Sequence, residues 1–138
     1  MTEPLSLSMV LFSGTDDKLT AASVLAVGAA SLDRPVRIFL QYWALDAFRA
    51  DRIEKDHGAA PEAGREGAEL LHRFAERGGQ HWSETLRQIK EIGDVRITAC
   101  SLSMDILGIG RDDLDPLVDG IEGIAGFTGE ATGQLVFI

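Results

Sequence analysis

Short apolar runs alternate along the chain with longer segments whose apolar residues recur at helical spacing. The runs are rich in β-branched and large apolar residues, which is typical of buried strands, and they span residues 5–12, 36–40 and 95–99. The longer segments predict helices over residues 16–32, 66–77 and 81–92. A strand, a helix and a strand in succession form a βαβ unit, in which the two strands pair in parallel.

The last third of the chain continues this alternation with shorter elements. We expect a helix over 101–109, a short strand over 117–121, a glycine-rich helix over 125–132 and a closing strand over 135–138. Another short helix is expected to begin near residues 41–45, directly after the second strand. The whole pattern predicts an α/β sandwich with a mostly parallel sheet.

Residues 49–65 interrupt the pattern. The segment is charged, rich in small residues and broken by Gly58, Pro61 and Gly64, so we interpret it as a polar surface loop or mobile insertion that adds little to the core. The two helices that follow are joined by a pair of glycines, and we expect them to form an αα unit lying on the sheet.

The size and charge of the chain limit its classes of function. Its 138 residues suit one compact domain, which we assign to residues 1–138. The formal net charge of −9 repels phosphate backbones and anionic lipid surfaces, so we expect no nucleic-acid ligand. No apolar stretch reaches the roughly 20 residues that span a bilayer, and the N-terminal residues lack the pattern of a secretion signal. We therefore expect a soluble, cytoplasmic protein without a membrane span.

Cys100 is the candidate reactive residue. It is the only cysteine, which excludes an intramolecular disulfide and a Cys-x-x-Cys pair. It ends a predicted strand and precedes a predicted helix, at the sheet edge where ligands of parallel α/β proteins collect. Free N–H groups at a helix start stabilise a thiolate, and Ser101 and Ser103 add potential donors for a thiolate or a bound persulfide.

A structural role for Cys100 is the competing interpretation. An unpaired cysteine at the end of an apolar strand is most often a small buried hydrophobe, and its position alone does not decide between the two roles. An intermolecular redox sensor, which would dimerise reversibly on oxidation, is a third possibility.

Other residue patterns do not predict a cofactor or a metal site. Glycines recur at every third residue between Gly120 and Gly129, but they form neither a P-loop nor a dinucleotide motif, so we interpret them as positions of close backbone packing. The spacing of the three histidines matches no common set of metal ligands, and we place them on solvated surface: His57, His72 and His81.

Three stretches resemble the DsrE/DsrF/TusD sulfur-relay family, in particular its DsrE-like, peroxiredoxin-related branch. The segment TACSLSMDILGI at 98–109 is similar to the cysteine-containing segment of that family. The stretch FSGTDDK at 12–18 resembles its first turn, and FLQYWAL at 39–45 resembles its aromatic segment after the second strand. The three matches occur in family order, whereas the polar insertion at 49–65 departs from the family pattern.

The resemblance implies a fold, an assembly and a chemistry. The fold would be a three-layer α/β/α sandwich with about five strands, assembled as a homo-oligomer, either a trimer or a hexamer. Cys100 would carry sulfane sulfur as a persulfide and exchange it with a donor or acceptor protein or a small thiol, as a sulfur carrier or a sulfurtransferase does. The remaining motif positions would line a pocket: Gly14, Lys18, Trp43, Ser101, Ser103 and Asp105.

Two hypotheses of different class therefore remain. In the first, the protein is a sulfur carrier or sulfurtransferase subunit that acts through Cys100. In the second, it is a non-catalytic oligomeric or regulatory protein of the same fold, in which Cys100 is structural. Lys18 is similarly open, because it could face a bound anion or simply be a surface lysine beside Asp16 and Asp17.

Overall fold

The computed structural model describes residues 5–138 and contains a five-stranded sheet whose neighbouring strands all pair in parallel. The strand order is β4-β3-β2-β1-β5. The strands are β1 (Leu7–Leu11), β2 (Val36–Leu40), β3 (Val95–Cys100), β4 (Gly120–Glu122) and β5 (Gln134–Phe137). This confirms the predicted α/β class with its parallel five-stranded sheet.

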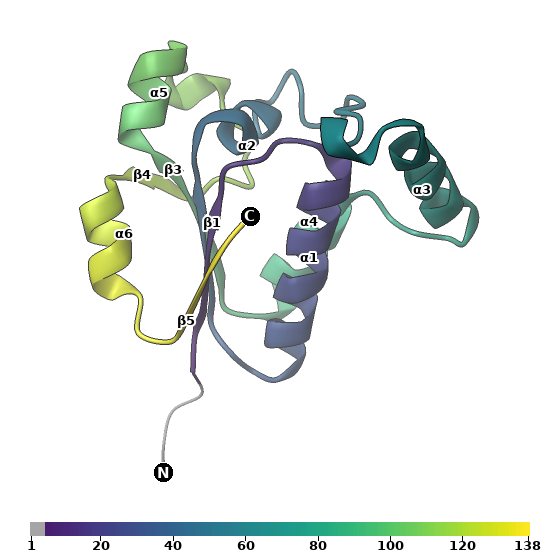
Figure 1. The fold of residues 1–138 in the computed structure, drawn as a ribbon. Coiled ribbons are helices and arrows are strands. Elements are labelled where there is room, and N and C mark those ends of the chain that lie inside the picture. Colours follow the sequence, from purple (N-terminus) through teal and green to yellow (C-terminus); the bar gives the residue numbers. More distant parts are fainter. Residues whose placement is uncertain (1–4) are drawn as a thin grey trace.

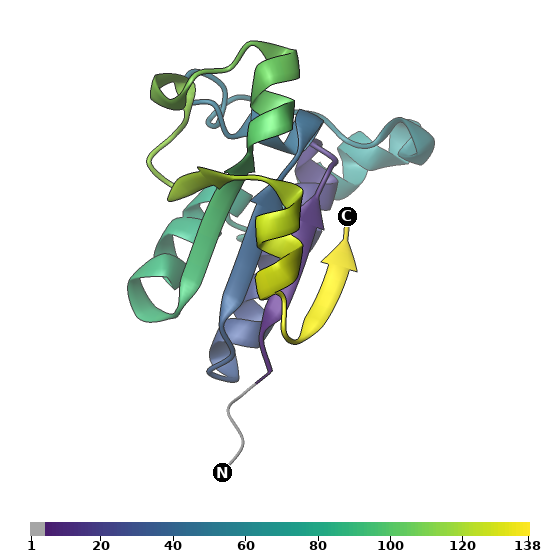
Figure 2. The same ribbon diagram turned by 90° about the vertical axis from the view of Figure 1, so that its left-hand side faces the viewer.

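Helices cover both faces of the sheet (Figure 1). Helices α1 (Asp16–Ser31) and α4 (Trp82–Ile92) pack together on one face, and α6 (Ile124–Glu130) lies on the other. Figure 2 shows α6 in front of the sheet, between β4 and the edge strand β5. The other helical elements are α2 (Tyr42–Ala47), α3 (Arg65–Glu76), α5 (Ser101–Leu107) and two 3-10 turns, η1 (Pro61–Ala63) and η2 (Arg111–Asp113). Within residues 5–138, none of the helices combines the length and the apolar character that crossing a bilayer requires.

The main core fills the space between the sheet and the pair formed by α1 and α4. Met9, Ile38 and Ile97 contribute to it from three neighbouring strands and are almost completely buried. A second, smaller cluster is formed by Val10, Phe39, Cys100 and Phe127. Because side chains alternate along a strand, Val10 and Phe39 face the opposite side from Met9 and Ile38. Burial on both faces explains why these two strands end in continuous apolar runs, at residues 9–11 and 38–40.

The polar segment 49–65 is anchored to the start of α1. The N–H of Asp16 donates to the Gly58 carbonyl oxygen at 2.8 Å, and Oδ2 of Asp16 accepts the N–H of His57 at 2.9 Å. Both carboxylate oxygens of Asp17 lie 3.1 Å from the N–H of Ala60. The two acidic residues at the start of α1 therefore hold a loop that is distant in sequence.

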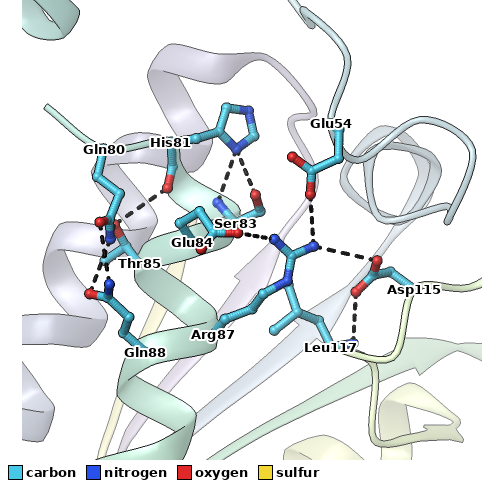
Figure 3. Close-up of polar contacts among 10 residues, drawn as sticks. All are labelled: Glu54, Gln80, His81, Ser83, Glu84, Thr85, Arg87, Gln88, Asp115 and Leu117. Carbon is cyan, nitrogen blue, oxygen red and sulfur yellow. Dashed lines mark hydrogen bonds and ion pairs between the residues drawn. The ribbon is translucent and has the colours of Figure 1, made fainter.

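Arg87 on α4 also binds the 49–65 segment, through Glu54 (Figure 3). Its guanidinium donates to Glu54 at 2.9 Å, lies 3.5 Å from Oδ2 of Asp115 and also pairs with Glu84 of its own helix. Burial acts to lower the pKa of Arg87, but the hydrogen bonds with Glu54 and Glu84 outweigh it and raise that pKa. Ile53 lies close to this contact in sequence and is buried, so the segment contributes more to the core than its composition predicts.

The arrangement of α3 differs from the sequence-based expectation. Of the two helices α3 and α4, only α4 packs against the sheet, whereas Leu70 and Phe74 of α3 remain exposed. A Cβ atom on Gly67 of α3 would lie 2.5 Å from the Cβ atom of Ala59, so this helix packs against the anchored loop. The loop occupies the position beside the start of α1, and it therefore keeps α3 away from the sheet.

The fourth strand also begins later than expected, at Gly120 instead of residue 117. Leu117 is buried in a turn, where its N–H donates to Oδ1 of Asp115 at 2.9 Å. The apolar character of this stretch reflects burial in a turn and not strand pairing.

We expect Asp17→Asn to loosen the 57–62 loop. Burial acts to raise the pKa of Asp17, but the Thr15 hydroxyl and the N–H groups of Ala60 and Lys18 outweigh it and lower that pKa below 3.8. The carboxylate therefore stabilises the fold at pH values above about 4, and this contribution disappears as the pH falls through the folded-state pKa. The variant should lose about 1 kcal/mol of unfolding free energy at pH 7 and less near pH 3.

Chemical denaturation at both pH values measures this difference. Glu66→Gln is a matched control, because Glu66 also occupies the first turn of a helix. An equal loss in both variants would mean that the helix dipole, and not the loop, accounts for the effect.

A second prediction concerns the turn between β1 and α1. A Cβ atom on Gly14 would lie 2.3 Å from the Trp43 carbonyl oxygen, so Gly14→Ala must separate this turn from α2. We expect a loss of about 1–3 kcal/mol of unfolding free energy, as for other overpacked positions. Gly28→Ala, in the middle of α1 with no atom within 4 Å of the new methyl group, should instead gain up to about 1 kcal/mol. Equal unfolding free energies for the two variants would show that the close approach is not required.

Candidate functional site

A cavity of about 310 Å³ lies where β1 and β2 end. Its walls come from the turn after β1, the first turn of α1, helix α2 and the anchored loop. Three of the predicted pocket residues line it together, namely Gly14, Lys18 and Trp43. In open parallel sheets, ligands bind beyond the carboxyl ends of the strands, near the point where the strand order reverses. Here the order reverses at β1, which lies between β2 and β5, so the cavity occupies the position that this rule favours.

The backbone around the cavity is closely packed. The N–H of Gln41 donates to the Leu11 carbonyl oxygen at 2.9 Å, which holds together the two chain segments that leave β1 and β2. Tyr42 adopts a φ of +40°, a left-handed conformation that costs a non-glycine residue on the order of 1–3 kcal/mol. The carbonyl group of Trp43, the next residue, then lies directly against Gly14. This strained turn fixes Trp43, whose side chain is largely exposed, at the cavity wall.

The charges around the cavity are partly neutralised. Nζ of Lys18 lies 2.9 Å from Oε1 of Glu62, and this hydrogen bond raises the pKa of Lys18 and lowers the pKa of Glu62. Asp46 lines the cavity and pairs with Arg52. Lys18 is therefore already partnered, which makes it a weaker anion ligand than its position in the sequence suggested.

His57 is the residue in this cavity that our interpretation of the sequence missed. The sequence predicts a position on solvated surface, but His57 is half-buried and lines the cavity, and its Nε2 atom has no hydrogen-bond partner among the described residues. Its contact with the cavity depends on the anchored loop, which no local motif predicts. Among residues 5–138, no three potential His, Cys, Asp or Glu ligands are grouped so as to hold a metal ion.

Cys100 lies at the end of β3, immediately before α5. Its side chain is 4% exposed, and its Sγ atom accepts the N–H of Ser103 at 3.4 Å. The ring of Phe127, which belongs to α6, stacks on the ring of Phe39 with 5.0 Å between centroids and belongs to the same cluster as Cys100. The sulfur atom is therefore held at a helix start, as the sequence predicted, and it is buried in the cluster to which the aromatic side chain of α6 also belongs.

The other three predicted residues follow Cys100 on α5 and have different environments. Ser101 and Asp105 line a shallow surface depression beside Ile121. Ser103 is fully buried, and its Oγ atom has no hydrogen-bond partner among the described residues. Cys100 does not line the cavity of Gly14 and Trp43, although α2, which carries Trp43, packs against α5. The structure thus divides the predicted site residues into two groups at one edge of the sheet.

Comparisons with known proteins agree with this fold. The family model described as "DsrE/DsrF/DrsH-like family" matches residues 4–65, a range that includes every segment around the cavity but ends before Cys100. Two solved structures share the architecture. The protein of unknown function MTH1491 from Methanobacterium thermoautotrophicum is 15% identical, with a TM-score of 0.59 over 97% of this chain and 99% of that chain. The ychN protein of E. coli is 18% identical, with a TM-score of 0.56 over 96% and 97%.

A relative in sequence spans almost the whole chain. The uncharacterised protein YrkE of Bacillus subtilis (strain 168) is 31% identical over 144 residues, which cover 90% of this chain and 89% of YrkE. The similarity in sequence therefore extends through the cysteine-containing half that the family model does not match. Together with the parallel sheet and the resemblance of the three motifs, these matches show that the chain belongs to the DsrE/DsrF/DrsH-like family.

Proposed function

We propose that this protein is a sulfur carrier that holds sulfane sulfur on Cys100 as a persulfide. The observation that supports the proposal most directly is the hydrogen bond from the N–H of Ser103 to Sγ of Cys100 at 3.4 Å. The thiolate is the nucleophile in sulfur exchange, and an N–H group at a helix start can donate a hydrogen bond to its sulfur atom. Membership of the DsrE/DsrF/DrsH-like family makes a sulfur-relay role plausible.

The proposed transfer has two exchange steps. In the first, the Cys100 thiolate attacks the outer sulfur of a donor persulfide, the donor S–S bond breaks, and the donor leaves as a thiolate. In the second, an acceptor thiolate attacks the outer sulfur on Cys100. The S–S bond to Cys100 breaks, and the Cys100 sulfur leaves again as a thiolate. Neither step changes the net oxidation state, because one S–S bond forms as another breaks. The donor and acceptor would be a protein or a small thiol.

The burial of Cys100 requires part of the structure to open before transfer. The element best suited to move is α6, because Phe127 is its only buried residue. The helix is seven residues long and contains Gly126 and Gly129, each of which lowers helix stability by about 1 kcal/mol relative to alanine. Displacement of Phe127 would uncover the sulfur without disturbing the main core on the other face of the sheet.

The same burial favours a second candidate function. A cysteine packed among Val10, Phe39 and Phe127 has the environment of a structural residue. In that case the protein would be a non-catalytic oligomeric or regulatory member of its family.

The two candidate functions predict different results for sulfur uptake by Cys100 and for the reactivity of its thiol. For a carrier, mass spectrometry after incubation with a persulfide donor should detect one added sulfur on the wild type and none on Cys100→Ser. Native Cys100 should also react with a small alkylating reagent, and Phe127→Ala should accelerate that reaction at least tenfold by removing the cover. Phe74→Ala, which removes the same ring from the exposed face of α3, should leave the rate unchanged. If the thiol reacts only after unfolding in the wild type and in both phenylalanine variants, and the wild type takes up no sulfur, Cys100 has the structural role.

We also propose that the protein forms a homo-oligomer, either a trimer or a hexamer, through the edge strand β5. Its side chains Leu135 and Phe137 are 55% and 67% exposed, and the rings of Phe137 and Phe12 lie 6.1 Å apart. An edge strand with exposed apolar side chains favours association with another chain.

Light scattering coupled to size-exclusion chromatography tests this assembly. The wild type should elute as more than one chain, and Phe137→Glu should shift it to the monomer because a charge replaces the exposed ring. Leu70→Glu, which changes a comparably exposed residue on α3, should leave the assembly intact. A wild type that stays monomeric at all concentrations would contradict the proposal.

A further inference from the structure

The carboxyl ends of β3 and β4 lie together at the position of Cys100. In the parallel register of the two strands, Cys100 pairs with Glu122. Both strands then continue into the starts of α5 and α6, where Oγ of Ser101 lies 3.9 Å from the position that a Cβ atom would take on Gly123. The starts of the two helices are therefore neighbours beside Cys100, on the same side of the molecule (Figure 1).

Exposed apolar side chains follow at the start of both helices. Leu102 on α5 and Ile124 on α6 come directly after Ser101 and Gly123, and they are 59% and 47% exposed. Ile106 lies one turn after Leu102 on the same helix and is 62% exposed. These three residues, Leu102, Ile106 and Ile124, are called the α5–α6 patch below. A group of exposed large apolar side chains is typical of a surface that contacts another protein.

The charges around the α5–α6 patch are mainly negative. The chain after Cys100 contains one basic side chain, Arg111, and seven acidic ones, of which Asp115 and Asp119 pair with basic residues of α4. The other five have no salt-bridge partner among residues 5–138, and they are Asp105, Asp112, Asp113, Glu122 and Glu130. Three of these five lie on α5, β4 and α6, which are the elements that adjoin Cys100.

Glu122 lies on the same face of the sheet as Cys100. Its Oε2 atom accepts the Thr98 hydroxyl at 2.6 Å, and Thr98 and Cys100 are alternate residues of β3. Its Oε1 atom lies 3.4 Å from the position that a Cβ atom would take on Gly126, so the carboxylate reaches α6. A carboxylate in this position attracts a positively charged partner and repels an anionic thiol.

Two arginines oppose this negative field without reversing it. Arg96 is exposed and precedes Cys100 by four residues on β3, which is about 13 Å along the strand and exceeds the Debye length of about 8 Å at physiological salt. Its guanidinium lies beside Gly120, at the start of β4. Arg111 follows α5 and is itself followed directly by two aspartates. The field that a partner meets near Cys100 is therefore negative.

We propose that the partner of Cys100 in sulfur exchange is a protein whose thiol lies among basic side chains and beside an apolar surface. The apolar surface covers the α5–α6 patch, which a small thiol would leave exposed, and the basic side chains face Asp105, Glu122 and Glu130. The same positive charges stabilise the partner thiolate that attacks the outer sulfur of the Cys100 persulfide; the S–S bond to Cys100 breaks, and the Cys100 sulfur leaves as a thiolate. The assignment of this partner rests on the proposed sulfur-carrier function, to which it adds the class of donor or acceptor.

Two matched peptides test the charge of the partner. Each has terminal leucines and a central cysteine activated as a disulfide with 2-thiopyridine, and the cysteine is flanked by lysines in one peptide and by glutamates in the other. The Cys100 thiolate attacks the peptide sulfur, and absorbance follows the 2-thiopyridine that leaves. Each rate is divided by the rate of the same peptide with 2-mercaptoethanol, which corrects for intrinsic reactivity. The basic peptide should react at least tenfold faster at low salt, and this ratio should fall toward one at about 1 M salt.

Surface variants locate the contact. Glu122→Gln and Asp105→Asn should each lower the ratio of the two peptide rates at least twofold, whereas Glu69→Gln, which neutralises an exposed glutamate of α3, should leave it unchanged. Ile106→Ser should slow both peptides at least threefold without changing the reaction of a small neutral probe, 2-hydroxyethyl 2-pyridyl disulfide. Leu70→Ser, which changes a comparably exposed residue on α3, should have no effect on either peptide.

The outcomes separate this partner from the sulfur-carrier function itself. Equal rates for the two peptides, or equal ratios in Glu122→Gln and Glu69→Gln, would overturn the partner class even if Cys100 takes up sulfur. If the 2-pyridyl disulfide of cysteamine reacts as fast as the basic peptide, the partner is a small cationic thiol and not a protein. A preference for the basic peptide without sulfur uptake would refute the sulfur carrier and retain a basic protein thiol as the partner in disulfide exchange. If Cys100 reacts with neither peptide, in the wild type and in Phe127→Ala, both proposals are wrong.

Discussion

The in-register parallel pairing of β1, β2 and β3 is the constraint on which the other features depend. It directs Met9, Ile38 and Ile97 toward α1 and α4, where they form the core. The same register gathers the residues between them on the opposite face, including Arg96 and Cys100. A shift of one residue in any of these strands would exchange the two faces. The core and the polar face are thus two results of a single pairing arrangement.

The two faces of the sheet are covered very unequally. Helices α1 and α4 provide a continuous apolar cover on one side, whereas α6 covers the other with one buried residue, Phe127. The chemistry-bearing groups of the strands lie on the weakly covered side. The main core and the small cluster beneath α6 are therefore separate, so a displacement of α6 would not by itself open the main core.

The insertion at 49–65 has a structural role that its composition conceals. Asp16, Asp17 and Arg87 fix it by hydrogen bonds and ion pairs to α1 and α4. In this position it supplies His57 to the cavity at the end of β1 and keeps α3 away from the sheet. A segment that the sequence predicts to be a polar surface loop therefore forms part of the wall of the cavity at the end of β1.

The sequence by itself determined the class of fold, the order of the elements and the position of Cys100 at a helix start, because these depend on local periodicity and on apolar runs. The resemblance of its motifs to a known family named Gly14, Lys18 and Trp43 as pocket residues, but it grouped them with Ser101, Ser103 and Asp105. Only the tertiary structure decided that these residues line a cavity without Cys100, and that Phe127 of α6 joins the buried cluster around Cys100. Contacts between segments distant in sequence depend on packing geometry, which leaves no periodic signal along the chain.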